Sequence, residues 1–166
     1  MTTASPVPAI DMSVRDTDDD VDREGSTWDP DHDITMSFGH AGSAQDVQAV
    51  RALVARYYKV AASGDGAKAC SLLYWLSAEA IVEERNSGRP RSQHQTCAQV
   101  AAKAFRRHHA ELAAEAPQVV TVTILRVKGK RGIARATFGA TLERLVPVML
   151  DGGAWRMGAL LDQGAP

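Results

Sequence analysis

The 166-residue chain lacks several features that would assign it to a familiar class. It contains no run of eighteen apolar residues, so the sequence predicts no membrane-spanning helix. Cysteine is scarce, with two residues and no Cys-x-x-Cys pair, and no histidines stand at metal-ligand spacing. Phosphate-loop and nucleophile-elbow motifs are absent, and Gly64-x-Gly66 lacks the third glycine of a dinucleotide-binding turn. We therefore predict neither a metal nor a cofactor.

The given sequence also lacks a positively charged start followed by seven or more apolar residues. As written, the chain is predicted to be neither exported nor membrane-spanning. However, an acidic spacer with several prolines often follows a cleaved signal or a lipid anchor. An extracytoplasmic location therefore stays open if the start is truncated, beside a cytoplasmic one.

The formal charge of −1 hides an uneven distribution of charge. Residues 1–40 hold ten acidic residues and two arginines, a balance of −8, so the remaining 126 residues carry +7. A segment with dense like charge and few periodic apolar residues cannot bury enough surface to offset the loss of backbone entropy. We predict a disordered acidic arm over residues 1–40 and one folded domain over residues 41–166.

The arm contains aspartates at every second position, Asp18, Asp20 and Asp22, which is the spacing of a calcium loop. Such a loop requires glycine at its sixth position and glutamate at its twelfth. Arg23 and Asp29 stand at those positions. The sequence therefore favours a solvated acidic spacer over a calcium site.

Hydrophobic periodicity predicts helices first and strands afterwards. Apolar residues recur at three- and four-residue steps between Val50 and Ala61, as on one buried helical face, and this helix stops at Ser63–Gly66. Two-residue alternation dominates after Pro117. The predicted helices span residues 43–62, 65–84 (with a bend) and 96–114, and the predicted strands span residues 119–127, 133–138, 142–150 and 154–161. Helices followed by a meander of strands indicate an α+β fold.

The two cysteines lie near the starts of the second and third predicted helices. If these starts are neighbours, Cys70 and Cys97 can form a disulfide worth about 3 kcal/mol in the chain-entropy estimate. Such a bond would indicate an oxidising compartment. Two separately buried thiols are the alternative, because free cysteine is a common small core residue.

The order of these elements resembles the nuclear-transport-factor-2-like (NTF2-like) superfamily over residues 44–162. The resemblance rests on Tyr57-Tyr58 through Gly64-Asp65 and on the segment from Gly152 to Met157. It implies a cone-shaped α+β fold, with three N-terminal helices packed on a curved four-stranded antiparallel meander sheet. In that superfamily an apolar pocket between the helices and the sheet holds the ligand.

The ketosteroid-isomerase and SnoaL-like branch gives a sharper comparison. Arg56-Tyr57, six further residues and Gly64-Asp65 match its pattern, so the resemblance places Tyr57 where an oxyanion-stabilising tyrosine sits. With about three residues inserted, Glu84 would match the general base. Met149 stands where the branch has a protonated carboxylic acid, so the catalytic set is incomplete. The predicted ligand-binding residues are Tyr57, Tyr58, Phe105, His108, Met149 and Trp155.

Each of these residues also has a structural interpretation. Tyr57 would be a core residue with a satisfied hydroxyl, Glu84 would be solvated at a helix end, and His108 would be a core histidine. We therefore predict a non-catalytic small-molecule-binding or interaction domain.

Two other functions are alternatives. One is an isomerase, dehydratase or cyclase that uses Tyr57 and Glu84. The other is a binder of nucleic acid or an acidic partner, because six cations are predicted to gather near one edge: Arg85, Arg89, Arg91, Lys103, Arg106 and Arg107. Having only nine aromatic residues argues against nucleic acid. The predicted assembly is a homodimer formed through the sheet.

Overall fold

The structure is a computed structural model that describes residues 36–140 and 142–161. The chain divides into two units, residues 1–34 and 35–166, and the fold described below belongs to the second. Apart from residues 36–40, the predicted acidic arm lies outside the described residues, and so does the alternative calcium loop.

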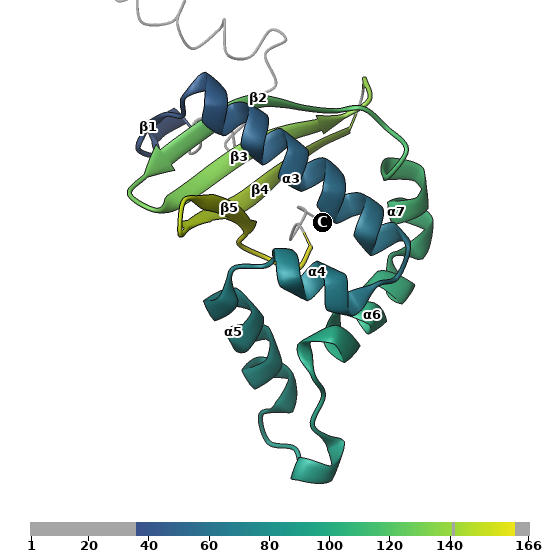
Figure 1. Ribbon diagram of the computed structural model, residues 1–166. Coiled ribbons are helices and arrows are strands. Elements are labelled where there is room, and N and C mark those ends of the chain that lie inside the picture. Colours follow the sequence, from purple (N-terminus) through teal and green to yellow (C-terminus); the bar gives the residue numbers. More distant parts are fainter. Residues whose placement is uncertain (1–35, 141, 162–166) are drawn as a thin grey trace, which may run out of the picture. The chain divides into compact units, whose positions relative to one another are not determined.

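The described residues form an α+β fold with five α-helices and five strands (Figure 1). The α+β prediction is confirmed, but the predicted four-stranded sheet gains a strand, β1, which pairs with β2. The strands form one antiparallel sheet in the order β1-β2-β3-β4-β5. The elements are β1 (His40–Ala41), α3 (Ala44–Ala62), α4 (Gly66–Leu72), α5 (Trp75–Asn86), a 3₁₀ turn (Arg91–Gln93), α6 (Cys97–Arg107), α7 (His109–Glu115), β2 (Val120–Lys128), β3 (Arg131–Phe138), β4 (Leu142–Asp151) and β5 (Ala154–Met157).

One face of the sheet is buried under the helices. Alternate residues of β3 and β4 point to this face, as the period of two requires, and they include Ala134, Ala136, Val146 and Val148. The pairing of β2 with β3 shifts register between Val122 and Ile124, as in a β-bulge. The shift allows the buried residues of β2 to keep facing the core on both sides of the irregularity.

Helix α3 begins at a capping box and lies across the sheet (Figure 1). The Ser43 hydroxyl accepts a hydrogen bond from the Asp46 backbone N–H at 3.1 Å, while the Asp46 carboxylate accepts from Ser43. The helix packs against β2, β5, α4 and α7. Its buried residues include all of the predicted stripe, namely Val50, Leu53, Val54, Tyr57, Tyr58 and Ala61, and Val60 is buried as well.

The second predicted helix is interrupted, so the prediction of one continuous, bent helix over residues 65–84 was wrong. Helix α4 ends at Leu72 and α5 starts at Trp75. Between them Leu73 is buried and forms a bridge with Met157, and the Tyr74 N–H donates to the Met157 carbonyl at 2.8 Å. No glycine or proline marks this break, because its cause is a contact with β5.

The third predicted helix is also divided, at His108, where the backbone angles are φ −105° and ψ 20°. Helix α7 then turns to pack against α3 and buries Leu112 and Glu115. Strand β5 ends at Met157 and is shorter than predicted, although the Gly158 N–H still donates to the Pro147 carbonyl of β4 at 2.8 Å.

Cys70 and Cys97 form a disulfide with a Cα–Cα distance of 6.2 Å, which confirms the predicted pairing. The bond joins α4 to the first residue of α6. Close packing of these helices depends on Gly66, because a Cβ atom there would lie 2.0 Å from the Ala98 carbonyl oxygen.

Helix α5 carries no fully buried residue, and only its half-buried Ala78 and Ile81 pack against the core. Figure 1 shows α5 and the loop that follows it projecting beyond the sheet. Its packing is against α6, and Trp75 and Leu76 in its first turn are about half exposed. Within residues 36–140 and 142–161, no helix combines the length and apolar character needed to cross a membrane.

Candidate functional site

Tyr57, the candidate oxyanion donor, is completely buried on α3. Its hydroxyl donates a hydrogen bond to the backbone carbonyl of Leu160, in the segment after β5. Burial raises the pKa of this hydroxyl far above its ordinary value, and the neighbouring Tyr58 raises it further. Tyr57 is therefore a neutral donor whose single proton already has an acceptor in the protein.

Aromatic side chains fill the space between the helices and the sheet around Tyr57. The Tyr57 ring meets Tyr58 and Phe105 edge-on, with centroid distances of 6.1 and 6.3 Å. The Tyr58 ring lies 4.5 Å from that of Phe138 on β3. Tyr57, Tyr58 and Phe105 thus lie together as contiguous packing in the core.

A groove of about 630 Å³ lies beside this packed interior. It runs between α5, α6 and the segment after β5, and Leu160, the acceptor for Tyr57, lies on its wall. Most of its lining is apolar. The lining residues are Ser77, Ala80, Ile81, Glu84, Ala104, His108 and Gly158–Leu161.

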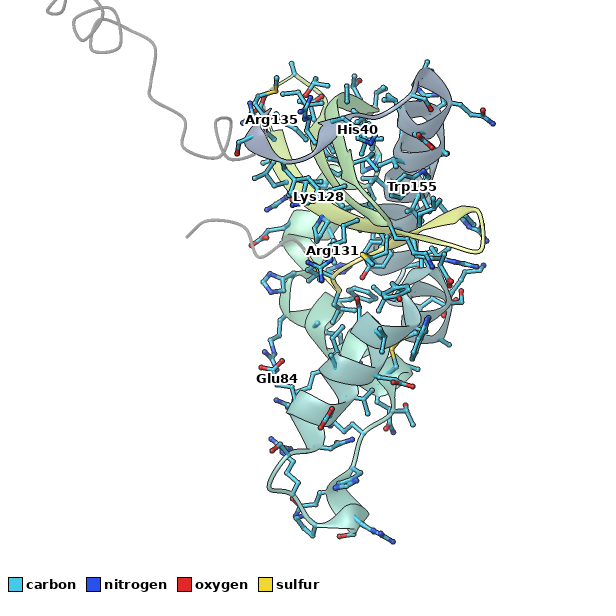
Figure 2. The ribbon with its side chains drawn as sticks, turned by 90° about the vertical axis from the view of Figure 1, so that its left-hand side faces the viewer. His40, Glu84, Lys128, Arg131, Arg135 and Trp155 are labelled. Carbon is cyan, nitrogen blue, oxygen red and sulfur yellow. A yellow bond between two sulfur atoms is a disulfide. The ribbon has the colours of Figure 1, made fainter. Side chains whose placement is uncertain are left out.

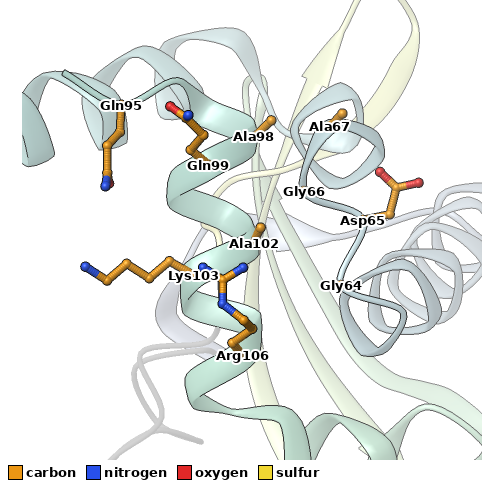
Figure 3. A pocket seen from close by; sticks show the side chains of 10 residues that line it. All are labelled: Gly64, Asp65, Gly66, Ala67, Gln95, Ala98, Gln99, Ala102, Lys103 and Arg106. Carbon is orange, nitrogen blue, oxygen red and sulfur yellow. The ribbon is translucent and has the colours of Figure 1, made fainter. Parts of the chain in front are cut away.

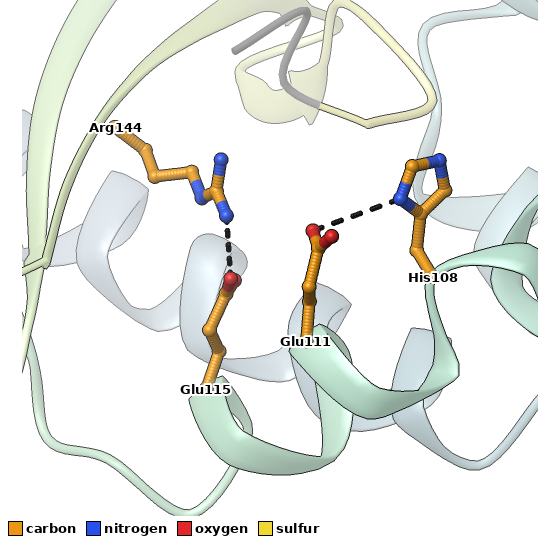
Figure 4. A network of polar contacts seen from close by, with 4 residues as sticks. All are labelled: His108, Glu111, Glu115 and Arg144. Atoms are coloured by element: carbon orange, nitrogen blue, oxygen red, sulfur yellow. Dashed lines mark hydrogen bonds and ion pairs between the residues drawn. The ribbon is translucent and has the colours of Figure 1, made fainter. Parts of the chain in front are cut away.

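Two predicted site residues, Glu84 and His108, border this groove. Glu84 is exposed and projects from α5 (Figure 2). The His108 side chain is 49% exposed, and its Nδ1 lies 3.6 Å from a carboxylate oxygen of Glu111 (Figure 4). The groove therefore places a carboxylate and an imidazole around an apolar floor.

The structure separates Met149 from the other predicted ligand-binding residues. On β4, Val146 and Val148 face the core, so Met149 points to the opposite face of the sheet. There it lies between Arg131 on β3 and Arg156 on β5. The side chain that reaches the core at this point of β4 is Val148.

Trp155 is buried and joins β5 to the start of α3. Its indole Nε1–H donates to the Asp46 carboxylate at 3.0 Å. This bond, followed by the bond from the Ser43 hydroxyl, holds the pKa of Asp46 below its ordinary value. The indole N–H of Trp155 thus already has a partner within the protein.

We expect Trp155→Phe to raise the pKa of Asp46, because phenylalanine has no N–H to stabilise the carboxylate. A carboxyl group whose pKa is lowered by folding stabilises the protein above its unfolded pKa, and that contribution is lost as the pH falls through the folded pKa. NMR titration of the Asp46 carboxyl carbon measures the change. Trp75→Phe is the matched control, since Trp75 is exposed on α5. An unchanged pKa in Trp155→Phe would contradict the assignment.

A buried ion pair between Arg144 and Glu115 was missed by the sequence analysis (Figure 4). An Arg144 guanidinium nitrogen lies 2.5 Å from a Glu115 carboxylate oxygen, and the Glu115 side chain is 6% exposed. The sequence offered a signal for this pair. Arg144, Val146 and Val148 are spaced by two residues, so their side chains point to the same face of β4. The pair connects α7 to β4.

A second cleft, of about 500 Å³, lies between the start of α4 and α6. Figure 3 shows Lys103 and Arg106 on α6, with Asp65 on the opposite side at the start of α4. Asp65 caps α4 by accepting from the Lys68 N–H at 3.0 Å. The charged groups of this cleft do not converge on one point, so it forms no catalytic constellation. Among the described residues, no cluster of three or more histidine, cysteine or acidic side chains could hold a metal ion.

Comparison with known proteins gives no match among protein-family models, curated proteins or solved structures. The fold defines an α+β protein with an open antiparallel sheet.

Proposed function

We propose that the domain is a non-catalytic, NTF2-like binding domain that takes a small apolar molecule in the groove between α5, α6 and the segment after β5. The proposal keeps the apolar ligand that the resemblance implies. It places that ligand beside the helices, because aromatic side chains fill the interior between helices and sheet.

The observation that carries the proposal is the hydrogen bond from Tyr57 to the Leu160 carbonyl. A hydroxyl with one proton cannot donate to this carbonyl and to a developing oxyanion at the same time. The same contact holds Leu160 against the groove, where it lines an apolar wall with Ile81 and Ala104. The geometry thus favours binding of apolar surface over stabilisation of charge.

Binding of the uncharged dye Nile red tests this assignment. Ile81→Lys places a charge on the groove and is expected to weaken dye binding by about tenfold or more, because the ligand would then bury an ammonium group. Val82→Lys is the matched control. Val82 is the next residue of α5, is half-buried to a similar degree, and lines a different depression next to Cys97.

Fluorescence titration should therefore give loss of binding in Ile81→Lys and unchanged affinity in Val82→Lys. Equal losses would place the dye elsewhere and contradict the groove. Absence of saturable binding to the unmodified protein would also contradict it.

The isomerase alternative has one observation in its favour, namely that Leu160 and Glu84 border the same groove. If Leu160 moved away, the Tyr57 hydroxyl and the Glu84 carboxylate would face a common space. Turnover of an enolisable ketosteroid that collapses in both Tyr57→Phe and Glu84→Gln would establish this function. We expect no such turnover, with Glu84→Gln leaving Nile red binding unchanged.

A further inference from the structure

The segment from Arg85 to His109 contains no acidic residue. Its 25 residues include six arginines or lysines and three histidines, whereas the chain as a whole carries a charge of −1. We call the six cations the basic stripe: Arg85, Arg89, Arg91, Lys103, Arg106 and Arg107. Such a composition places strong positive charge on one part of the domain.

The fold brings this charge together on the projecting α5–α6 region. Arg85 lies in the last turn of α5, Arg89 and Arg91 follow in the loop, and the other three occupy α6. The pKa of Lys103 is lowered, first by Arg85 and then by Arg107, Arg89 and Arg106, with a contribution from desolvation. Lys103 therefore lies within electrostatic reach of four of the five arginines of the stripe, all but Arg91.

No ion pair relieves this repulsion within the part of the chain that the structure describes. The described ion pairs involve other residues, and Arg85 instead donates from Nε to the Gln95 side-chain oxygen at 3.3 Å. Glu83 and Glu84 precede the stripe on α5 without an ion pair to it. An anionic partner would remove a repulsion that the described fold leaves in place.

The chemistry of the stripe distinguishes between classes of polyanion. Phe105, the one Phe, Tyr or Trp between Arg85 and His109, is buried, so the stripe offers no phenyl, phenol or indole ring on which a nucleic-acid base could stack. The exposed Trp75 and Leu76 lie in the first turn of α5, at the opposite end from Arg85, so among the described residues no large exposed apolar side chain accompanies the cations for insertion into a membrane.

Two further features favour a polysaccharide. Five of the six cations are arginines, whose planar guanidinium groups pair with carboxylate and sulfate groups through two hydrogen bonds. The disulfide between Cys70 and Cys97 anchors α6 and is typical of oxidising compartments, where acidic polysaccharides are available partners.

We propose that the basic stripe is a binding surface for a linear acidic polysaccharide. Its carboxylate or sulfate groups would lie along α6 and the tip of the loop, next to the side-chain amides of Gln95 and Gln99, which line the neighbouring cleft. The surface is independent of the apolar groove and would operate whether or not the groove binds a ligand.

Binding to immobilised alginate and to immobilised dextran sulfate tests the proposal with the full-length, disulfide-bonded protein. At about 50 mM NaCl we expect the triple variant Lys103→Gln, Arg106→Gln, Arg107→Gln to lose about tenfold or more in affinity for the polymer that binds, because three cationic contacts to its carboxylate or sulfate groups are removed. The two polymers separate carboxylate from sulfate recognition. Raising the salt should weaken binding of the unmodified protein.

The matched control removes the same charge from α3 through Arg51→Gln, Arg56→Gln and Lys59→Gln, all at exposed positions. Its affinity should stay within about twofold of the original, since these cations lie outside the stripe. If the α6 variant fails to fold, as judged by circular dichroism, Arg85→Gln, Arg89→Gln and Arg91→Gln test the same stripe at the loop.

Three results would overturn the proposal. The first is absence of binding to both polymers at low salt, and the second is an equal loss in the α3 control. The third is tighter binding to duplex DNA or to phosphatidylglycerol vesicles than to either polysaccharide, with the same dependence on the α6 cations. That result would assign the stripe to nucleic acid or to membrane.

Discussion

Replacing Glu115 by alanine is expected to lower the free energy of unfolding by about 3–5 kcal/mol, because it removes the buried carboxylate that lies 2.5 Å from the Arg144 guanidinium. The Glu115 and Arg144 side chains are 6% and 19% exposed, so water replaces little of the lost interaction. Urea denaturation followed by circular dichroism measures the change.

Glu143→Ala is the matched control for this prediction. Glu143 lies 3.9 Å from Arg135 but is 56% exposed, and exposed ion pairs contribute about 0–1 kcal/mol. The double variant Glu115→Leu, Arg144→Leu should recover most of the stability, because it removes both buried charges. If Glu115→Ala and Glu143→Ala cost the same, the Glu115–Arg144 pair is not a buried interaction.

Removing the disulfide by replacing Cys70 and Cys97 with alanine is expected to lower the free energy of unfolding by about 3 kcal/mol, because the unfolded chain regains the entropy of a closed loop of 27 residues. Urea denaturation of the oxidised protein with and without reductant measures the effect. Reductant should destabilise the original protein by the same amount.

The double variant provides the control, since reductant should leave its unfolding midpoint unchanged. We also expect peptide mass spectrometry to show the two cysteines linked in protein from an oxidising compartment. Two freely alkylatable thiols in such protein would contradict the bond. The disulfide would then no longer favour a polysaccharide partner of an oxidising compartment.

Local patterns in the sequence predicted the elements whose causes are local. The stripe on α3, the capping box at Ser43 and the stop at Gly64, whose φ is 75°, depend on neighbouring residues. The alternation in β3 and the hairpin between β4 and β5 are local in the same sense. The sequence also predicted the cysteine pairing from the positions of two helix starts.

Tertiary contacts decided the features that depend on residues far apart in the chain. The break before α5 comes from the backbone hydrogen bond between Tyr74 and Met157, and the residues next to Tyr74 in the sequence do not predict it. Met149 faces away from the core because successive strand residues point to opposite faces of the sheet, and Val148 points to the core. The position of Met149 in the motif therefore could not predict which face of the sheet its side chain occupies.

The candidate site divides in the same way. The sequence by itself determined that Tyr57 lies on the buried face of α3, because helical periodicity fixes which side chains share a face. Only the tertiary structure decided that its hydroxyl donates to Leu160, a residue 103 positions away, since a hydrogen bond needs a partner that folding brings within reach. That long-range contact, and not the tyrosine itself, directs the proposed function toward binding.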